Sequence, residues 1–160
     1  MAFVDSGGRA LWAEAQGDGP LAVLFLHGAG SNAATWWQQL PAFAARHRCI
    51  TMDLRCFGRS VAPMAEFDHA RFVQDAMAVL DHFGVARAVV IGQSLGGMVG
   101  LRLALQRPDR VAAFVACDSP LGVDHPAILD ALARRALTAS ARTLEQRALG
   151  AWFLQRDPER

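Results

Sequence analysis

Short apolar runs separated by helix-length segments constrain the fold of this 160-residue chain more than any other feature. The runs are LAVLFL (21–26), RCITMD (48–53), ARAVVIG (86–92) and RVAAFVACD (110–118). Each is long enough for a strand and far too short to cross a bilayer as a helix. Because apolar residues occupy consecutive rather than alternate positions, the runs are typical of strands buried on both faces of a sheet.

Helical patterns occupy the segments between these runs. They are 35–48 with an interruption at Pro41, 67–84 closed by Gly84, and 94–108 closed by Pro108. An earlier segment, 7–20, indicates a strand closed by a Gly/Asp/Pro turn. Strands that alternate with helices predict an α/β fold, in which helices flank both faces of a mostly parallel sheet.

The pattern changes after Pro120. Segments 126–138 and 144–155 both indicate helices, and no apolar strand lies between them. We therefore predict two parts. Residues 1–120 form the N-terminal part of an α/β core, and residues 121–160 begin a helical cap.

Composition argues against several classes of function. The formal net charge is only +1, so the chain lacks the basic excess that binds nucleic acid or anionic membranes. Cys49, Cys56 and Cys117 are too dispersed for a zinc site or a disulfide framework, and they predict reduced thiols in a cytoplasmic protein. The opening residues, MAFVDSGGRALW, lack the regions of a signal peptide. We expect no metal, no organic cofactor, no nucleic-acid partner and no membrane association.

The most specific motif is G-x-S-x-G at GQSLG (92–96), directly after a predicted strand and at the start of a predicted helix. In such a turn the serine takes a strained conformation, and the residues two before and two after it come too close together for side chains. Gly92 and Gly96 meet that requirement. The turn presents the Ser94 hydroxyl at the carboxyl end of the sheet, and the Leu95 N–H points toward an oxygen bound there. Ser94 is therefore the candidate nucleophile.

A second glycine turn, HGAG (27–30), follows the apolar run at 21–26. Such a turn can direct backbone N–H groups at the same oxygen. We interpret His27, which precedes the glycines, as a residue that shapes the loop rather than as a catalytic base.

Several stretches together resemble the α/β-hydrolase superfamily, with the nearest similarity to its esterase, enol-lactonase and peroxidase-like members. They are HGAGSNAATW (27–36), DLRCFGRS (53–60), GQSLGGMVG (92–100) and RPDRVAAFVACDSP (107–120). The resemblance implies that Ser94 is the nucleophile. It also implies that the backbone N–H groups of Ala29 and Leu95 form an oxyanion hole.

The resemblance further implies that Asp53, Arg55, Gly58 and Ser60 belong to a loop that braces the site. Cys56 stands where that loop usually has glycine. If the position requires a left-handed backbone, cysteine costs about 1 kcal/mol there. A reactive thiol at Cys56 is the alternative interpretation of this residue.

A serine nucleophile needs a base within reach and an acid that orients the base. The resemblance implies the chain order serine, acid, histidine, yet only His125 follows Ser94. We therefore expect the acid and the histidine to lie outside this chain, as in the N-terminal part of a hydrolase, with slow or no turnover. The alternative pairs Asp118 as acid with His125 as base. An incomplete sheet would also leave an apolar strand edge, through which we expect self-association.

Two rival functions remain open at this point. The segment GAGSNA (28–33) after a buried strand, with Asp53 at the end of the next, is close to a dinucleotide-binding fingerprint. Pro41 in the following helix and the unexplained motif at 92–97 weigh against it. The second rival is a hydrolase fold without catalysis, which would serve as a ligand-binding protein.

The sequence thus predicts a serine hydrolase for small carboxylic esters or lactones. Ester, lactone, amide, C–C bond and peroxide chemistry all occur on this motif, so the choice among them rests with pocket and cap residues. Candidates for an apolar acyl pocket, although such residues more often form ordinary core, are Trp36, Trp37, Met98, Trp152 and Phe153.

Overall fold

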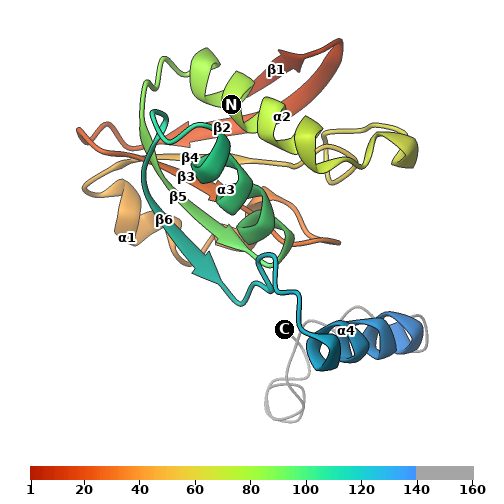
Figure 1. Cartoon of the computed structure of the whole chain (residues 1–160). Coiled ribbons are helices and arrows are strands. Elements are labelled where there is room, and N and C mark those ends of the chain that lie inside the picture. Colours follow the sequence, from red (N-terminus) through yellow and green to blue (C-terminus); the bar gives the residue numbers. More distant parts are fainter. Residues whose placement is uncertain (140–160) are drawn as a thin grey trace, which may run out of the picture. The chain divides into compact units, whose positions relative to one another are not determined.

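The computed structural model describes residues 1–139. Contacts divide the chain into two units, Met1–Leu121 and Gly122–Arg160. The first unit holds a six-stranded sheet with the strand order β1-β2-β4-β3-β5-β6 (Figure 1). The second unit contains α4 (Pro126–Ala139). The helix predicted at 144–155 lies outside the described residues, and the assignment of residues 121–160 to a cap stays a prediction.

The parallel part of the sheet follows the four apolar runs of the sequence. Its strands are β3 (Ala22–Leu26), β4 (Arg48–Met52), β5 (Ala88–Gln93) and β6 (Val111–Cys117). β3 pairs in parallel with both β4 and β5, and β5 pairs in parallel with β6. All five residues of β3 are buried, as consecutive apolar positions predict. The predicted α/β fold with a mostly parallel sheet is confirmed.

An antiparallel hairpin extends the sheet at the other side. β1 (Ala2–Ser6) pairs with β2 (Arg9–Gln16), and β2 pairs antiparallel with β4. The turn between them uses Gly7 and Gly8 at φ values of 60° and 79°, which glycine adopts without steric cost. The sequence analysis predicted a single strand in this region and missed β1. The Gly-Gly dipeptide was the available signal.

Two helices cover one face of the sheet (Figure 1). They are α2 (His69–His82) and α3 (Leu95–Gln106). The larger core lies beneath them and includes Leu24 and Leu26 of β3. Asp68 caps the N-terminus of α2, and its carboxylate accepts hydrogen bonds from the backbone N–H groups of the first turn. A short 3₁₀ turn, η2 (Met64–Glu66), precedes it.

Within residues 1–121, the opposite face carries only short helical elements, η1 (Ala33–Trp36) and α1 (Leu40–Ala44). The smaller core lies there and includes Val23 and Phe25, the alternate residues of β3. The prediction of a mostly helical 35–48 segment was therefore wrong in extent. Pro41 does not interrupt a helix but stands in the first turn of α1, where its missing N–H costs nothing.

β6 is the edge strand of the parallel part, and much of it is exposed. Val115 has 45% of its surface accessible, and Ala112, Ala113 and Ala116 are exposed as well. An apolar strand edge is a template for pairing with another chain. Self-association through this edge stays a prediction.

Candidate active site

Ser94 connects β5 to α3 in a strained conformation. Its φ is 51° and its ψ is −112°, outside the regions that residues with a Cβ normally occupy. Such a conformation costs about 1–3 kcal/mol and persists only where the surroundings enforce it. The side chain is partly exposed and makes no capping hydrogen bond to the helix that it begins. The hydroxyl is therefore presented rather than used for folding.

The glycines on either side of Ser94 explain why the turn can be so sharp. A Cβ placed on Gly92 would overlap the carbonyl group of Gly96. A Cβ placed on Gly96 would overlap the carbonyl group of Leu26, at the end of β3. The backbone of the turn thus packs directly against itself and against β3, and no other residue fits at these two positions.

The glycine turn after β3 lies against the serine. A Cβ built on Gly28 would stand 3.3 Å from the Ser94 Cβ and would overlap the side chain of Gln93. Ala29 follows at the surface, and Leu95 opens α3. Within residues 1–139, neither the Ala29 N–H nor the Leu95 N–H donates to a turn, loop or capping hydrogen bond. Leu95 is the first residue of α3, and first-turn N–H groups have no partner inside their own helix.

His27 is fixed by two hydrogen bonds. Its Nε2 accepts from the Leu54 N–H at 2.9 Å, so its Nδ1 carries the proton and donates to the Gly28 carbonyl at 2.8 Å. The ring is fully buried, and this burial lowers the pKa of His27. A neutral imidazole with both nitrogens occupied shapes the loop, as the sequence analysis expected, and has no nitrogen left to act as a base.

Asp53 joins the two loops that surround the site. Its carboxylate accepts from the Ala33 N–H at 2.8 Å and from the Arg59 N–H and Nε at 2.8 and 2.9 Å. Burial raises the pKa of this carboxyl, but the bonds from Arg59 and Ala33 outweigh burial and lower it. Because both oxygens are occupied, Asp53 cannot serve as the ribose-binding acid of a dinucleotide site. The Ser60 hydroxyl donates to the Asp53 carbonyl at 2.6 Å and completes the brace.

Arg55 anchors the same loop to the first strand and to α2. Its guanidinium donates to Asp75 at 2.6 and 2.9 Å, to Glu66 at 2.7 Å and to the Ser6 carbonyl at 3.0 Å. Asp75 is fully buried and also accepts from the Ser6 hydroxyl. Hydrogen bonds from Arg9 and Arg55 lower the pKa of Glu66 to about 2. The sequence analysis placed Arg55 in the brace but missed these carboxylates, which no local motif marks.

Cys56 has a left-handed backbone, with φ at 71°, so it carries the cost anticipated for a residue in a glycine position. Burial, followed by the charge of Glu66, raises the pKa of its thiol. A raised pKa reduces the thiolate fraction at neutral pH, and the thiolate is the reactive form. The environment of Cys56 therefore argues against the reactive-thiol interpretation.

The candidate acid and base are placed as follows. Asp118 follows β6, is exposed, and has a positive φ of 42°. His125 is exposed and belongs to the second unit. Within residues 1–121, no side chain forms a hydrogen bond with the Ser94 hydroxyl. The pairing of Asp118 with His125 stays a prediction.

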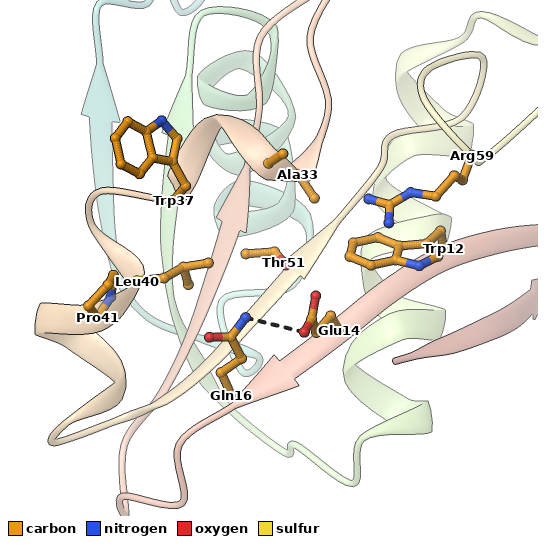
Figure 2. Close-up of a pocket in the computed structure, with 10 residues that line it drawn as sticks. Trp12, Glu14, Gln16, Ala33, Trp37, Leu40, Pro41, Thr51 and Arg59 are labelled. Atoms are coloured by element: carbon orange, nitrogen blue, oxygen red, sulfur yellow. Dashed lines mark hydrogen bonds between the residues drawn. The ribbon is translucent and has the colours of Figure 1, made fainter.

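A pocket of about 320 Å³ lies over β2 and β4, beside η1 and α1 (Figure 2). Trp37 lines it, as do Trp12 and Arg59, whose guanidinium stacks on the Trp12 indole at 3.2 Å. Gly28, Ser94 and Leu95 are not among its lining residues, so it is separate from the serine. Trp36 belongs to the core instead, with its ring 5.1 Å from that of Phe25.

Met98 is partly buried in the first unit. The remaining candidates for the acyl pocket, Trp152 and Phe153, lie outside the described residues. Among residues 1–139, no cluster of His, Cys, Asp or Glu side chains is arranged to hold a metal ion. In the same part of the chain, no helix combines the length and apolar character that crossing a membrane requires.

Comparisons with known proteins show the family of this chain. The family model for the alpha/beta hydrolase fold matches residues 22–158, and the chain belongs to this family. A protein of Variovorax paradoxus strain S110 named "Putative carbamate hydrolase RutD" is 44% identical over 96 residues, which cover 59% of this chain and 36% of that protein.

Two further similarities reach into the second half of the chain. The 3-oxoadipate enol-lactonase 2 of Acinetobacter baylyi is 28% identical over 148 residues, covering 90% of this chain and 55% of the lactonase. The solved structure of Est816, described as an N-acyl homoserine lactone degrading enzyme, superposes with a TM-score of 0.79 at 30% identity. That superposition covers 98% of this chain and 61% of Est816. The chain thus spans about one third of the length of the Variovorax relative and about one half of the length of the lactonase.

Proposed function

We propose that the chain carries the nucleophile and the oxyanion hole of a serine hydrolase that acts on carboxylic esters or lactones. One observation supports this above all others. Ser94 is partly exposed in a strained turn at the carboxyl end of β5, with the Gly28 loop packed against it. Strain of this kind accumulates at functional sites, because folding alone would favour a relaxed backbone.

The proposed reaction begins when the Ser94 Oγ attacks the carbonyl carbon of the substrate. A C–O bond forms, the hydroxyl proton passes to a base outside the described residues, and the carbonyl oxygen becomes an oxyanion. The N–H groups of Ala29 and Leu95 stabilise that charge. Collapse of the intermediate expels the alcohol, or opens the lactone ring, and leaves an acyl-serine that water hydrolyses.

The substrate class is proposed from the relatives. One relative is named as an enol-lactonase, and Est816 is described as an N-acyl homoserine lactone degrading enzyme. Both names refer to lactones, in which the acyl carbon is open to nucleophilic attack. A carbamate, as named for the Variovorax relative, presents a similar carbonyl. Small esters and lactones are therefore the first compounds to assay.

Covalent labelling tests the nucleophile. A fluorophosphonate probe should label the wild-type chain at Ser94, as located by mass spectrometry of the peptides, and should leave Ser94→Ala unlabelled. Thr35→Ala, which removes an exposed hydroxyl from η1, is the matched control and should label like the wild type. Labelling at another residue, or none in the wild type even at high pH, would refute the proposed nucleophile.

The pH dependence of labelling locates the base. If the base lies outside the chain, hydroxide must take the proton, and the rate should rise about tenfold per pH unit without levelling. A rate that levels off at high pH, with the levelling abolished by His125→Ala, would instead show that His125 serves as the base.

A second candidate function is ligand binding without catalysis. It is favoured because no side chain within residues 1–121 hydrogen-bonds to the Ser94 hydroxyl. Hydrolysis of p-nitrophenyl acetate separates the two candidates. Turnover that Ser94→Ala abolishes supports the hydrolase, whereas lactone binding with no labelling and no turnover supports the binding protein.

A further inference from the structure

Ser119 lies just after β6 and contacts the nucleophile turn. Its hydroxyl donates a hydrogen bond to the backbone carbonyl oxygen of Ser94, with 2.7 Å between the two oxygens. The same hydroxyl oxygen accepts from the Leu121 N–H at 3.2 Å. The two serines are 25 positions apart, and no sequence motif connects them. Within residues 1–121, this contact is the only hydrogen bond from a side chain to the turn at 92–97.

The Ser94 carbonyl belongs to the same peptide unit as the Leu95 N–H. A trans peptide is planar, with its C=O and N–H pointing in opposite directions. Fixing the oxygen at one end therefore fixes the direction of the hydrogen at the other. The Leu95 N–H is one of the two proposed oxyanion donors, so its direction decides how well it meets the developing charge.

We propose that Ser119 is a positioning residue that directs the Leu95 N–H into the oxyanion hole. This inference rests on the proposed function. The Ser94 carbonyl also accepts from the Gly97 and Met98 N–H groups, at 3.0 and 3.2 Å, and the Ser119 bond is the shortest of the three. A hydrogen bond accepted at the carbonyl also polarises the peptide, which strengthens the N–H as a donor.

The backbone around Ser119 is built to bring its hydroxyl to this place. Asp118 and Leu121, on either side, have positive φ values of 42° and 55°, an uncommon conformation for residues with a Cβ. On the facing helix, a Cβ placed on Gly97 would lie 2.5 Å from both the Cβ and the Oγ of Ser119. The glycine at 97 thus leaves the room that Ser119 occupies.

The test compares substrates that use the oxyanion hole to different degrees. Ser119→Ala should lower the rate of Ser94 acylation by an activated ester about tenfold, less than the loss of a whole donor. A matched thionoester, whose sulfur accepts N–H bonds poorly, should lose much less. Ser119→Cys, a weaker donor of similar size, should have an acylation rate between those of Ser119→Ala and the wild type. Thr35→Ala should match the wild type. A proportional loss with ester and thionoester would show a merely structural role and overturn the proposal.

A measurement on the amide itself does not depend on catalysis. In the proton–nitrogen spectrum, the Leu95 amide proton should move upfield in Ser119→Ala, because its peptide loses polarisation. An unchanged Leu95 signal would refute the positioning role even if Ser94 reacts. A shifted signal in a chain whose Ser94 is never acylated would uphold the structural coupling and reject the proposed hydrolase.

Discussion

Two of the turns at the carboxyl edge of the sheet hold a non-glycine residue at a positive φ, and they do so by different physical means. Ser94, at φ 51°, follows β5, and Cys56, at φ 71°, lies in the loop after β4. The Ser94 turn is enforced by close packing of uncharged backbone around glycines. The Cys56 loop is held by the hydrogen-bonded charges of Asp53, Arg55 and Arg59.

This difference separates backbone strain that exposes a functional group from backbone strain that does not. The packed turn leaves the Ser94 hydroxyl without a folding role, which is how a nucleophile must be presented. In the charged loop, the Cys56 side chain contacts a backbone carbonyl, with its sulfur 3.4 Å from the Pro63 oxygen. We therefore propose that the strain at Ser94 serves the active site, whereas the strain at Cys56 is a cost that the hydrogen-bonded charges of its loop tolerate.

The largest expected effect comes from filling the packed turn. Gly96→Ala should lower the free energy of unfolding by about 3 kcal/mol, because the new methyl group overlaps the Leu26 carbonyl and the backbone must shift. Urea denaturation measures the change. Gly122→Ala, at an exposed glycine with nothing within 4 Å of a built Cβ, is the control and should change little. Equal stability of the two variants would contradict the claim that close packing enforces the turn at Ser94.

The next largest effect is a difference in acid sensitivity: lowering the pH should weaken the charged loop around Cys56 but not the packed turn at Ser94. The folded-state pKa of Glu66 is about 2 against an ordinary 4.5, so its contribution to stability is complete above about pH 4.5 and is lost as the pH falls toward 2. Glu66→Gln should therefore unfold more easily at pH 7 and show a weaker acid dependence between pH 4.5 and 2, measured by urea denaturation. The turn at 92–97 has no titratable carboxyl, amine or imidazole. The cost of Gly96→Ala should thus be the same at pH 7 and pH 5.

The smallest expected effect is a gain. Cys56→Gly should raise the free energy of unfolding by about 1 kcal/mol, because glycine adopts a φ of 71° without steric cost. Cys56→Ala keeps the Cβ and should bring no gain, which separates backbone relief from loss of the sulfur contact. Thermal or urea unfolding of both variants provides the measurement. If alanine stabilises as much as glycine, the strain at Cys56 is not the cause.

The parts of the fold that the sequence predicted are those with a strong local signal. The consecutive apolar positions of 21–26 and 86–92 marked strands buried on both faces, and the glycines around Ser94 marked the sharp turn. The prediction of helix over 35–48 was wrong because a helical apolar pattern also suits short turns that cover a sheet face.

The hydrogen bonds that hold the candidate site in place could not be predicted from local sequence patterns. Arg55 meets Asp75 across 20 positions and the Ser6 carbonyl across 49, and Ser119 reaches Ser94 across 25. Charged and hydroxyl side chains at such separations look like ordinary surface residues in the sequence, because nothing near them in the chain records their partner. Only the order of strands in the sheet brings them together.

By itself, the sequence determined which residues can make the strained turn, because steric exclusion of a Cβ acts between atoms a few residues apart. It also determined the alternation of strands and helices, since burial follows apolar periodicity. Tertiary structure alone decided what surrounds that turn: the Gly28 loop against Ser94, the occupied carboxylate of Asp53 and the Ser119 hydroxyl on the Ser94 carbonyl. Hydrogen bonds act over about 3 Å in space, whatever the distance along the chain.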